Sequence, residues 1–249
     1  MLMATDLHRC LDPVQLAIDA DITPDDWQAK LLRERPKRCL MCCSRQSGKT
    51  EVAIHLGLWT ALYEPGSLVL VVSPSQRQSG ETFRRLMLNH AKLKGVPELT
   101  QESALRAELS NGSRIIALPG SEKTTRGYAG ARMVILDEAA RVPDELLAAI
   151  RPTMATVDGS LIALSTPQGQ RGFFYESWVG DDPSWTKVMV TADQCPRLTR
   201  EYLRGELKAL GPSMFRQEFG CEFVADDEAL FAAPMITRAF TNEIRPLWS

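Results

Sequence analysis

The sequence has no apolar run near the roughly 20 residues that a membrane-spanning helix needs, and it carries almost no excess charge. Its beginning, Met1–Pro13, contains acids and lacks a long apolar core, so it does not resemble a signal peptide. The net charge is −2 and the isoelectric point about 6.0, so composition gives no indication of a polyanionic partner. We therefore expect a cytoplasmic protein with no membrane partner.

Metal-binding patterns are also scarce. The chain has three scattered histidines and six cysteines, namely Cys10, Cys39, Cys42, Cys43, Cys195 and Cys221. Cys39 and Cys42 have the spacing of a zinc or redox pair, but they lie in the apolar stretch Arg38–Cys43, and no second ligand pair follows. Burial in a strand explains these thiols better, with a metal or redox site as the alternative.

The sequence does contain a regular alternation of strand and helix patterns. Its 249 residues are 44% hydrophobic and 24% charged, as in a globular protein. Leu68–Ser73 is apolar nearly throughout, which is typical of a parallel sheet covered on both faces. The predicted strands are Cys39–Cys43, Leu68–Ser73, Arg114–Leu118, Met133–Leu136, Leu161–Ser165 and Lys187–Thr191. The predicted helices are Lys49–Leu62, Gln76–Lys94 and Pro143–Ile150.

Two further signals complete the predicted organisation. The turn Ser110–Ser113 contains Asn-Gly and predicts a hairpin between Ala107–Leu109 and Arg114–Leu118. From about Pro196 the strand signal fades and helical patterns take over. The pattern predicts an α/β fold, with a mainly parallel sheet covered by helices on both faces and a small C-terminal helical subdomain.

A phosphate-binding loop follows the first predicted strand. That strand ends at Cys43 and leads into Ser44-Arg45-Gln46-Ser47-Gly48-Lys49-Thr50 and then a helix. In such a loop the backbone N–H groups bind phosphate oxygens. Gly48 permits close approach, Lys49 reaches the β and γ phosphates, and the Thr50 hydroxyl ligates Mg²⁺. The usual first glycine of the motif is Cys43 here, so a simple strand-to-helix turn is the alternative.

Two acids end another apolar strand, Met133–Leu136. Downstream of a phosphate loop this is the Walker B arrangement, in which Asp137 binds the Mg²⁺ shell and Glu138 orients and deprotonates the attacking water. A strand followed by an acidic helix is the alternative. Because both patterns occur in one α/β chain, we predict a joint site for ATP and Mg²⁺.

Two arginines compete for the role of stabilising the transferring γ-phosphate, a step that depends mainly on electrostatics. Arg45 lies inside the loop and would act in cis. Arg126 precedes the Walker B strand and would act on its own or a neighbouring subunit's nucleotide. A surface ion pair is the alternative for either residue.

Two more features belong to the predicted site. Asp26-Trp27-Gln28 lies upstream of the first strand, where the Gln28 amide would read the adenine edge, with a core role for the aromatic neighbour as the alternative. Ser165-Thr166-Pro167 ends the strand after Walker B and would sense the γ-phosphate and relay hydrolysis to the rest of the molecule. A strand simply terminated by proline is the alternative.

In this order the motifs resemble those of the large terminase subunit of tailed bacteriophages. The likeness is to the N-terminal ATPase half of a terminase of the prophage type. The likeness covers nearly the whole chain, and the family's loop form tolerates a residue such as Cys43 at the first glycine position. The matching segments are Pro24–Gln28, Ser44–Thr50, Ser73–Gln76, Asn111–Ser113, Arg126–Gly127, Leu136–Ala140, Ser165–Gly169, Phe174–Tyr175, Trp178, Phe215–Phe219 and Glu222–Phe223.

The resemblance implies a RecA-like P-loop NTPase that uses ATP and Mg²⁺ to pump double-stranded DNA into a procapsid, in the cytoplasm of a bacterial host. It implies a ring of subunits when active, a possible monomer in isolation, and a portal protein and small terminase subunit as partners. It makes residues 1–195 the ATPase core with its adenine-side segment, and residues 196–249 a lid and linker. Ser165–Pro167 would couple hydrolysis to motion.

Family members typically continue into an RNase H-like metal nuclease. The remaining carboxylates of this chain form no second acidic cluster, so we expect no nuclease activity from it. A helicase-like protein is one alternative, but it requires a second RecA-like domain for which the chain has no length. A catalytically idle nucleotide-binding assembly module is another, against which the intact Lys49, Asp137 and Glu138 argue.

Overall fold

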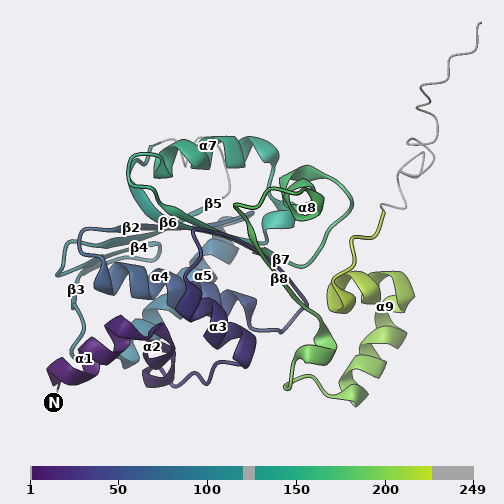
Figure 1. The fold of residues 1–249 in the computed structure, drawn as a ribbon, viewed down its shortest axis with the longest axis horizontal. Coiled ribbons are helices and arrows are strands. Elements are labelled where there is room, and N and C mark those ends of the chain that lie inside the picture. The colour runs from purple at the N-terminus through teal and green to yellow at the C-terminus, as the bar shows by residue number, and fades with distance from the viewer. Residues whose placement is uncertain (1, 120–126, 226–249) are drawn as a thin grey trace, which may run out of the picture.

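The structure is a computed structural model that describes residues 2–119 and 127–225 (Figure 1). The described α-helices are α1 (Leu2–Leu11), α2 (Pro13–Asp19), α3 (Asp26–Glu34), α4 (Lys49–Tyr63), α5 (Gln76–Lys92), α7 (Asp144–Met154), α8 (Gly172–Val179) and α9 (Arg200–Gly220). The strands are β1 (Arg38–Cys43), β2 (Leu68–Ser73), β3 (Leu99–Glu102), β4 (Arg106–Leu109), β5 (Arg114–Pro119), β6 (Ala131–Asp137), β7 (Ser160–Ser165) and β8 (Thr186–Val190). Two short 3₁₀ helices are η1 (Ala139–Arg141) and η2 (Ala192–Gln194).

The strands form one sheet in the order β3-β4-β5-β2-β6-β7-β1-β8. The pairs from β5 to β8 along this order are all parallel, whereas β3, β4 and β5 pair antiparallel at one edge. In a parallel sheet the carboxyl ends of the strands share one edge, and ligands bind in the crevice beyond it. The topology therefore brings the loops after β1, β6 and β7 together.

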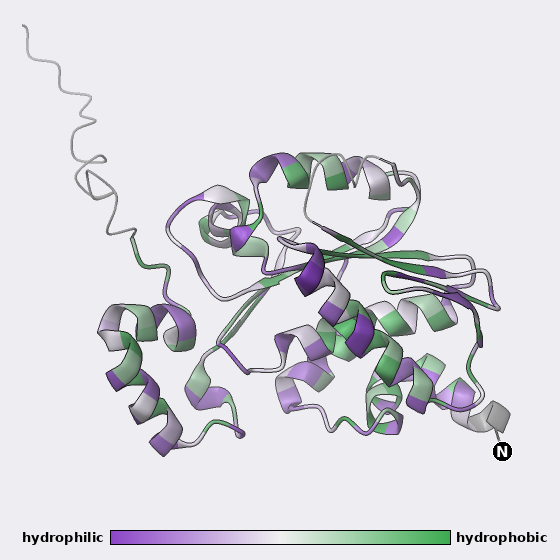
Figure 2. Cartoon of the chain, turned by 180° about the vertical axis from the view of Figure 1, so that it is seen from behind, coloured by the Kyte–Doolittle hydropathy of each residue, from purple (hydrophilic) through white to green (hydrophobic). Residues whose placement is uncertain are grey.

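The sheet is covered on both faces. Along β2, Val69 and Val71 pack into the cluster that includes α4 and α5, whereas Leu70 and Val72 pack into the cluster that includes α7 and α8. Figure 1 shows α7 and α8 on one side of the sheet and α1 to α5 on the other. Figure 2 shows the central strands hydrophobic along most of their length, as burial on both faces requires.

The predicted α/β fold is confirmed, including the antiparallel pairing of Ala107 with Ile115 in the predicted hairpin. Sequence patterns missed β3, which is mostly exposed, and the helices α1, α2, α3 and α8. The division into a core of residues 1–195 and a lid of residues 196–249 stays a prediction. Within the described residues no helix is long and apolar enough to cross a membrane.

Helix α9 contains a sharp break. Gly211 has φ 76° and ψ 167°, a backbone conformation that is strained for any residue with a side chain, and Pro212 follows it. The break separates a mainly exposed first half from a second half that ends on the buried Glu218 and Phe219. Figure 1 shows α9 standing beside the end of the sheet rather than across either face. The second half is thus the part of α9 that contacts the core.

The cysteines are free thiols, and those other than Cys10 are buried. Burial raises the pKa of Cys39 to about 12, so this thiol is a poor nucleophile. Within the described part of the chain no three His, Cys, Asp or Glu side chains are placed to hold a metal ion. The five buried thiols pack within β1 and in the loops that follow η2 and α9.

Candidate nucleotide site

The predicted site residues meet at the carboxyl edge of the parallel strands. Asp137 at the end of β6 lies in register with Leu164 of β7, one residue before Ser165. Ser165 is in turn in register with Cys42 of β1, two residues before the phosphate loop. Residues separated by more than a hundred positions in sequence thus become neighbours across two strand pairings.

The phosphate loop is fixed at its start and stays partly buried. Ser44 N donates to Val190 O of β8 at 2.8 Å, which ties the loop to the neighbouring strand end. Lys49 is buried, and its Nζ donates to Ser44 O at 3.3 Å across the loop. Lys49 and Thr50 form the first turn of α4, whose free N–H groups and positive dipole favour a phosphate.

Gly48 permits a close contact between the loop and α3. Its φ is +87°, and a Cβ at this position would lie 2.4 Å from Gln28 Nε2. That amide donates to Gly48 O at 3.3 Å, while Gln28 Oε1 accepts from Asp25 N at 2.8 Å. Gln28 therefore braces the loop backbone, a role that the sequence did not predict. Its predicted contact with adenine stays a prediction.

Arg197 supplies a second brace from the segment that precedes α9. Its guanidinium donates to both carboxylate oxygens of Asp25, at 2.8 and 2.7 Å. The same group donates to Ser47 O at 3.1 Å. The bidentate geometry fixes the plane of the guanidinium, so the start of α3 and the loop are held together.

Asp137 is a buried carboxylate with two hydrogen bonds. Its Oδ2 accepts from Thr82 Oγ1 of α5 and its Oδ1 accepts from Glu138 N, both at 3.0 Å. Burial raises the pKa of Asp137, the Glu138 charge adds to this shift, and the Thr82 hydrogen bond and Lys49 oppose it. A buried carboxylate of this kind is stabilised by a cation placed beside it.

Glu138 sits in a left-handed backbone conformation, with φ 53° and ψ 44°, immediately after the strand. Its carboxylate forms an ion pair with Arg141 of η1 and lies 3.5 Å from Ser165 Oγ. Arg141 also lies 3.5 Å from Thr166 Oγ1. The structure thus brings Glu138 together with two residues of the predicted coupling segment Ser165–Pro167. The three residues of that segment are buried.

Arg45 points to α9. Its Nε donates to Glu218 Oε2 at 2.7 Å, and this hydrogen bond raises the pKa of the guanidinium. Arg45 N also donates to Glu218 O at 2.9 Å. The other predicted arginine, Arg126, lies outside the described residues.

The donor set suits Mg²⁺. Thr50 and Asp137 offer a hydroxyl and a carboxylate, which are the oxygen ligands that Mg²⁺ prefers. Mg²⁺ at phosphate sites takes one or two protein ligands, with phosphate and water oxygens completing the shell, so a larger carboxylate cage is not required. Among the described residues there is none.

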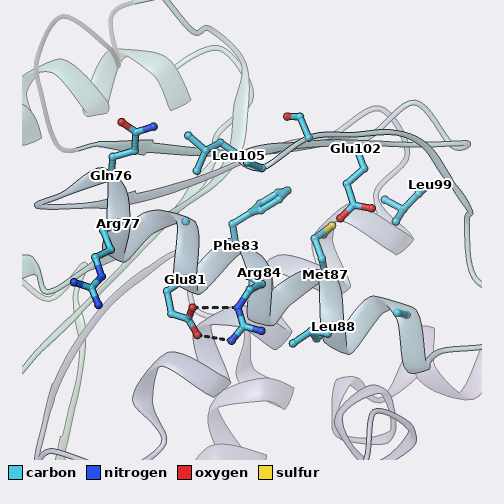
Figure 3. Close-up of a pocket in the computed structure, with 14 residues that line it drawn as sticks. Gln76, Arg77, Glu81, Phe83, Arg84, Met87, Leu88, Leu99, Glu102 and Leu105 are labelled. Atoms are coloured by element: carbon cyan, nitrogen blue, oxygen red, sulfur yellow. Dashed lines mark hydrogen bonds and ion pairs between the residues drawn. The ribbon is translucent and has the colours of Figure 1, made fainter.

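A large apolar cavity lies elsewhere. It has a volume of about 850 Å³ and is lined by α5 and the β3–β4 hairpin (Figure 3). Its charged pair, Glu81 with Arg84, is an exposed helix pair at 2.8 Å. The cavity shares no residue with the predicted site.

Sequence reasoning missed several members of the site. Thr82, Arg141, Arg197 and Glu218 received no role, although each contacts a predicted residue. Glu218 carried the only readable signal, because it is an acid between the aromatic residues Phe215 and Phe219 on a helix. Such an acid becomes buried and needs a partner, but the pattern does not show which one.

Fold and site together define the chain as a P-loop nucleotide-binding domain of the parallel-sheet type. Residues 40–238 match the family of N-terminal domains of terminase large subunits, T4-like virus type, and the chain belongs to that family. It is therefore the ATPase domain of a terminase large subunit.

Individual relatives agree with this membership. The terminase large subunit of Thermus phage G20c is 28% identical over 84% of this chain, which spans 50% of that relative's length. The ATPase domain of the Thermus phage P74-26 large terminase has a TM-score of 0.72 and 25% identity, over 84% of this chain and 97% of that one. The large terminase of bacteriophage D6E with ADP has a TM-score of 0.64 at 12% identity, over 77% and 49% of the two chains, which shows the fold alone.

Proposed function

We propose that this chain binds Mg-ATP and hydrolyses it as the motor domain of a DNA-packaging terminase. The observation that carries the proposal is the placement of Asp137 beside the end of β7, where Ser165 contacts Glu138, and of that strand end beside β1, which leads into the phosphate loop. Family membership supports it. The chain spans about half the length of the relatives it matches, so the activity of the whole protein is part of the proposal.

The chemistry follows from the residues. Ser44, Arg45, Gln46 and Ser47 contribute loop backbone around the phosphates, with Gly48, Lys49 and Thr50 at the start of α4. Thr50 and Asp137 would hold Mg²⁺, which neutralises phosphate charge when bound. Glu138 accepts the proton of the attacking water, and Arg45 stabilises charge on the γ-phosphate, with Arg126 as the second candidate.

The adenine side is proposed to lie near α3. A cavity of about 270 Å³ is lined by Asp25, Trp27, Val190 and Pro196 among others. Val190 O binds the first loop residue, so this cavity adjoins the loop. Gln28 reads the base edge in this proposal, which requires its amide to leave at least one of its present backbone partners.

The partners follow from the family. Double-stranded DNA is the translocated substrate, and the portal protein and the small terminase subunit are the assembly partners. The active form is a homo-oligomeric ring in the cytoplasm of a bacterial host. Ser165, Thr166 and Pro167 transmit the state of Glu138 to the rest of the molecule, which is supported by the 3.5 Å contact between Ser165 and Glu138.

The test is ATP turnover by wild type and Glu138→Gln, with and without double-stranded DNA. The variant should keep ATP affinity within about threefold and lose about 100-fold or more in kcat, because it retains the shape but not the base. Glu145→Gln, an exposed acid on α7, is the matched control and should behave as wild type. Binding without turnover in wild type would favour the idle assembly module, and full activity of Glu138→Gln would remove Glu138 from its role.

A further inference from the structure

Glu218 is an unusual side chain because it is charged, nearly fully buried and shared between two arginines. Its side chain is 6% exposed, and it belongs to the second half of α9, far in sequence from the loop. One carboxylate oxygen accepts from Arg45 Nε at 2.7 Å, and the other lies 3.5 Å from Arg141 Nη2. A buried carboxylate needs such partners, since an unpaired one would be expensive.

The four charged groups form a chain in space. Glu138 pairs with Arg141, Arg141 with Glu218, and Glu218 with Arg45. The first acid is the proposed base, and the last arginine belongs to the phosphate loop. Glu218 therefore connects the two reacting ends of the site, although it lies on a helix outside the sheet.

Glu218 contacts Arg45 at two points. The carboxylate of Glu218 accepts from Arg45 Nε, and the backbone carbonyl of Glu218 accepts from Arg45 N at 2.9 Å. A guanidinium has five donors, so this contact leaves the Nη groups to face a phosphate. The Arg45 side chain is 60% exposed, and without Glu218 it would sample many rotamers.

We propose that Glu218 is a positioning residue for ATP hydrolysis, which holds Arg45 at the phosphate loop and Arg141 beside Glu138 so that α9 sets the geometry of both arginines. The inference rests on the proposed function. It predicts that Glu218 acts on the chemical step through Arg45 and Arg141, not on nucleotide affinity.

The experiment compares kcat and KM for ATP, together with thermal stability, in Glu218→Gln and Glu222→Gln. Glu222 is the matched control, because it is an exposed acid, 57% exposed at its side chain, that follows α9 and pairs with Arg216. Glu218→Gln should lower kcat about tenfold or more with KM changed less than about threefold. Glu222→Gln should leave both unchanged.

A mutant cycle with Arg45→Gln and Arg141→Gln distinguishes positioning from structural support. If Glu218 acts through these two arginines, adding Glu218→Gln to the variant that lacks both should lower kcat less than about threefold further. Multiplying effects, or a loss of kcat that only follows a loss of folded protein, would overturn the inference.

A variant that does not fold, a failure of the positioning role and a failure of the proposed function give different results. If Glu218→Gln fails to fold, Glu218→Asp keeps the charge but shortens its reach, and wild-type kcat in that variant would overturn the inference. If wild type turns over ATP, Glu138→Gln does not, and Glu218→Gln does so at the wild-type rate, the positioning role alone is contradicted. A wild type without turnover contradicts the proposed function.

Discussion

At the scale of single residues, Asp137 and Glu138 are adjacent carboxylates with different surroundings. Asp137 is buried and accepts hydrogen bonds from Thr82 and from the backbone of Glu138. Glu138 turns out of the strand through a left-handed backbone and pairs with Arg141. The same edge of the sheet thus separates a carboxylate suited to a cation from one suited to a water molecule.

Asp137 gives a pH-dependent prediction. Its folded-state pKa is raised by burial, so between the unfolded value of about 3.9 and the folded value the folded protein binds more protons. Stability therefore falls as pH rises through that window. Asp137→Asn removes the free-energy cost of the buried ionised carboxylate. Without nucleotide, the Tm of the variant should exceed that of wild type at neutral pH, by about 2–4 °C for each kcal/mol of stability gained. This difference in Tm should narrow as pH falls.

Mg-ATP should raise the Tm of wild type by binding the folded protein, and the same variant should lose this response because it lacks the anionic ligand. The measurement is thermal unfolding at several pH values with and without Mg-ATP. Asp181→Asn, an exposed acid, is the control and should match wild type throughout. A lower Tm for nucleotide-free Asp137→Asn at neutral pH would contradict the assigned cause.

At the scale of elements, the phosphate loop is held by side chains from three segments outside the strand and helix that it joins. Gln28 of α3 and Arg197 bind the carbonyls of Gly48 and Ser47, and Glu218 of α9 binds Arg45. Backbone N–H groups can act as a phosphate site only if their directions are fixed. These braces preorganise the loop and connect it to α9.

Gly48 tests the contact between the loop and α3. Gly48→Ala imposes a left-handed alanine, costing about 1–2 kcal/mol, and places a Cβ 2.4 Å from Gln28 Nε2. Gly66→Ala is the matched control, because Gly66 has φ +73° but no atom within 4 Å of its Cβ position. We expect both variants to lose stability in urea unfolding, and only Gly48→Ala to lose about tenfold or more in ATP affinity.

Adding Gln28→Ala to Gly48→Ala removes the crowded amide and should restore part of the lost stability. Equal losses of stability and of ATP affinity in Gly48→Ala and Gly66→Ala would contradict an energetic contribution from the close contact with Gln28.

At the scale of the whole molecule, one sheet edge collects residues from nearly the full described chain. Loop residues 44–50, the acids after β6, the end of β7 and the second half of α9 meet there. Under the proposed function, a change at the γ-phosphate would reach α9 through two side chains, Arg45 and Glu218.

Much of this arrangement was readable from sequence. The buried parallel strands were predicted because their residues are apolar on both faces, and the loop and the acids because their spacing carries chemistry. Arg141, Arg197 and Glu218 were not, since periodicity shows which face a residue occupies but not its distant partner. The exposed strand β3 escaped for a related reason, as it has no buried pattern to detect.

The most direct test of the central claim is a crystal structure of this chain with Mg²⁺ and a slowly hydrolysed ATP analogue. We expect the triphosphate on the backbone N–H groups of residues 44–50, Mg²⁺ between Thr50 and Asp137, and the γ-phosphate facing Glu138 and Arg45. A nucleotide bound away from this edge, or Mg²⁺ held by other residues, would contradict it.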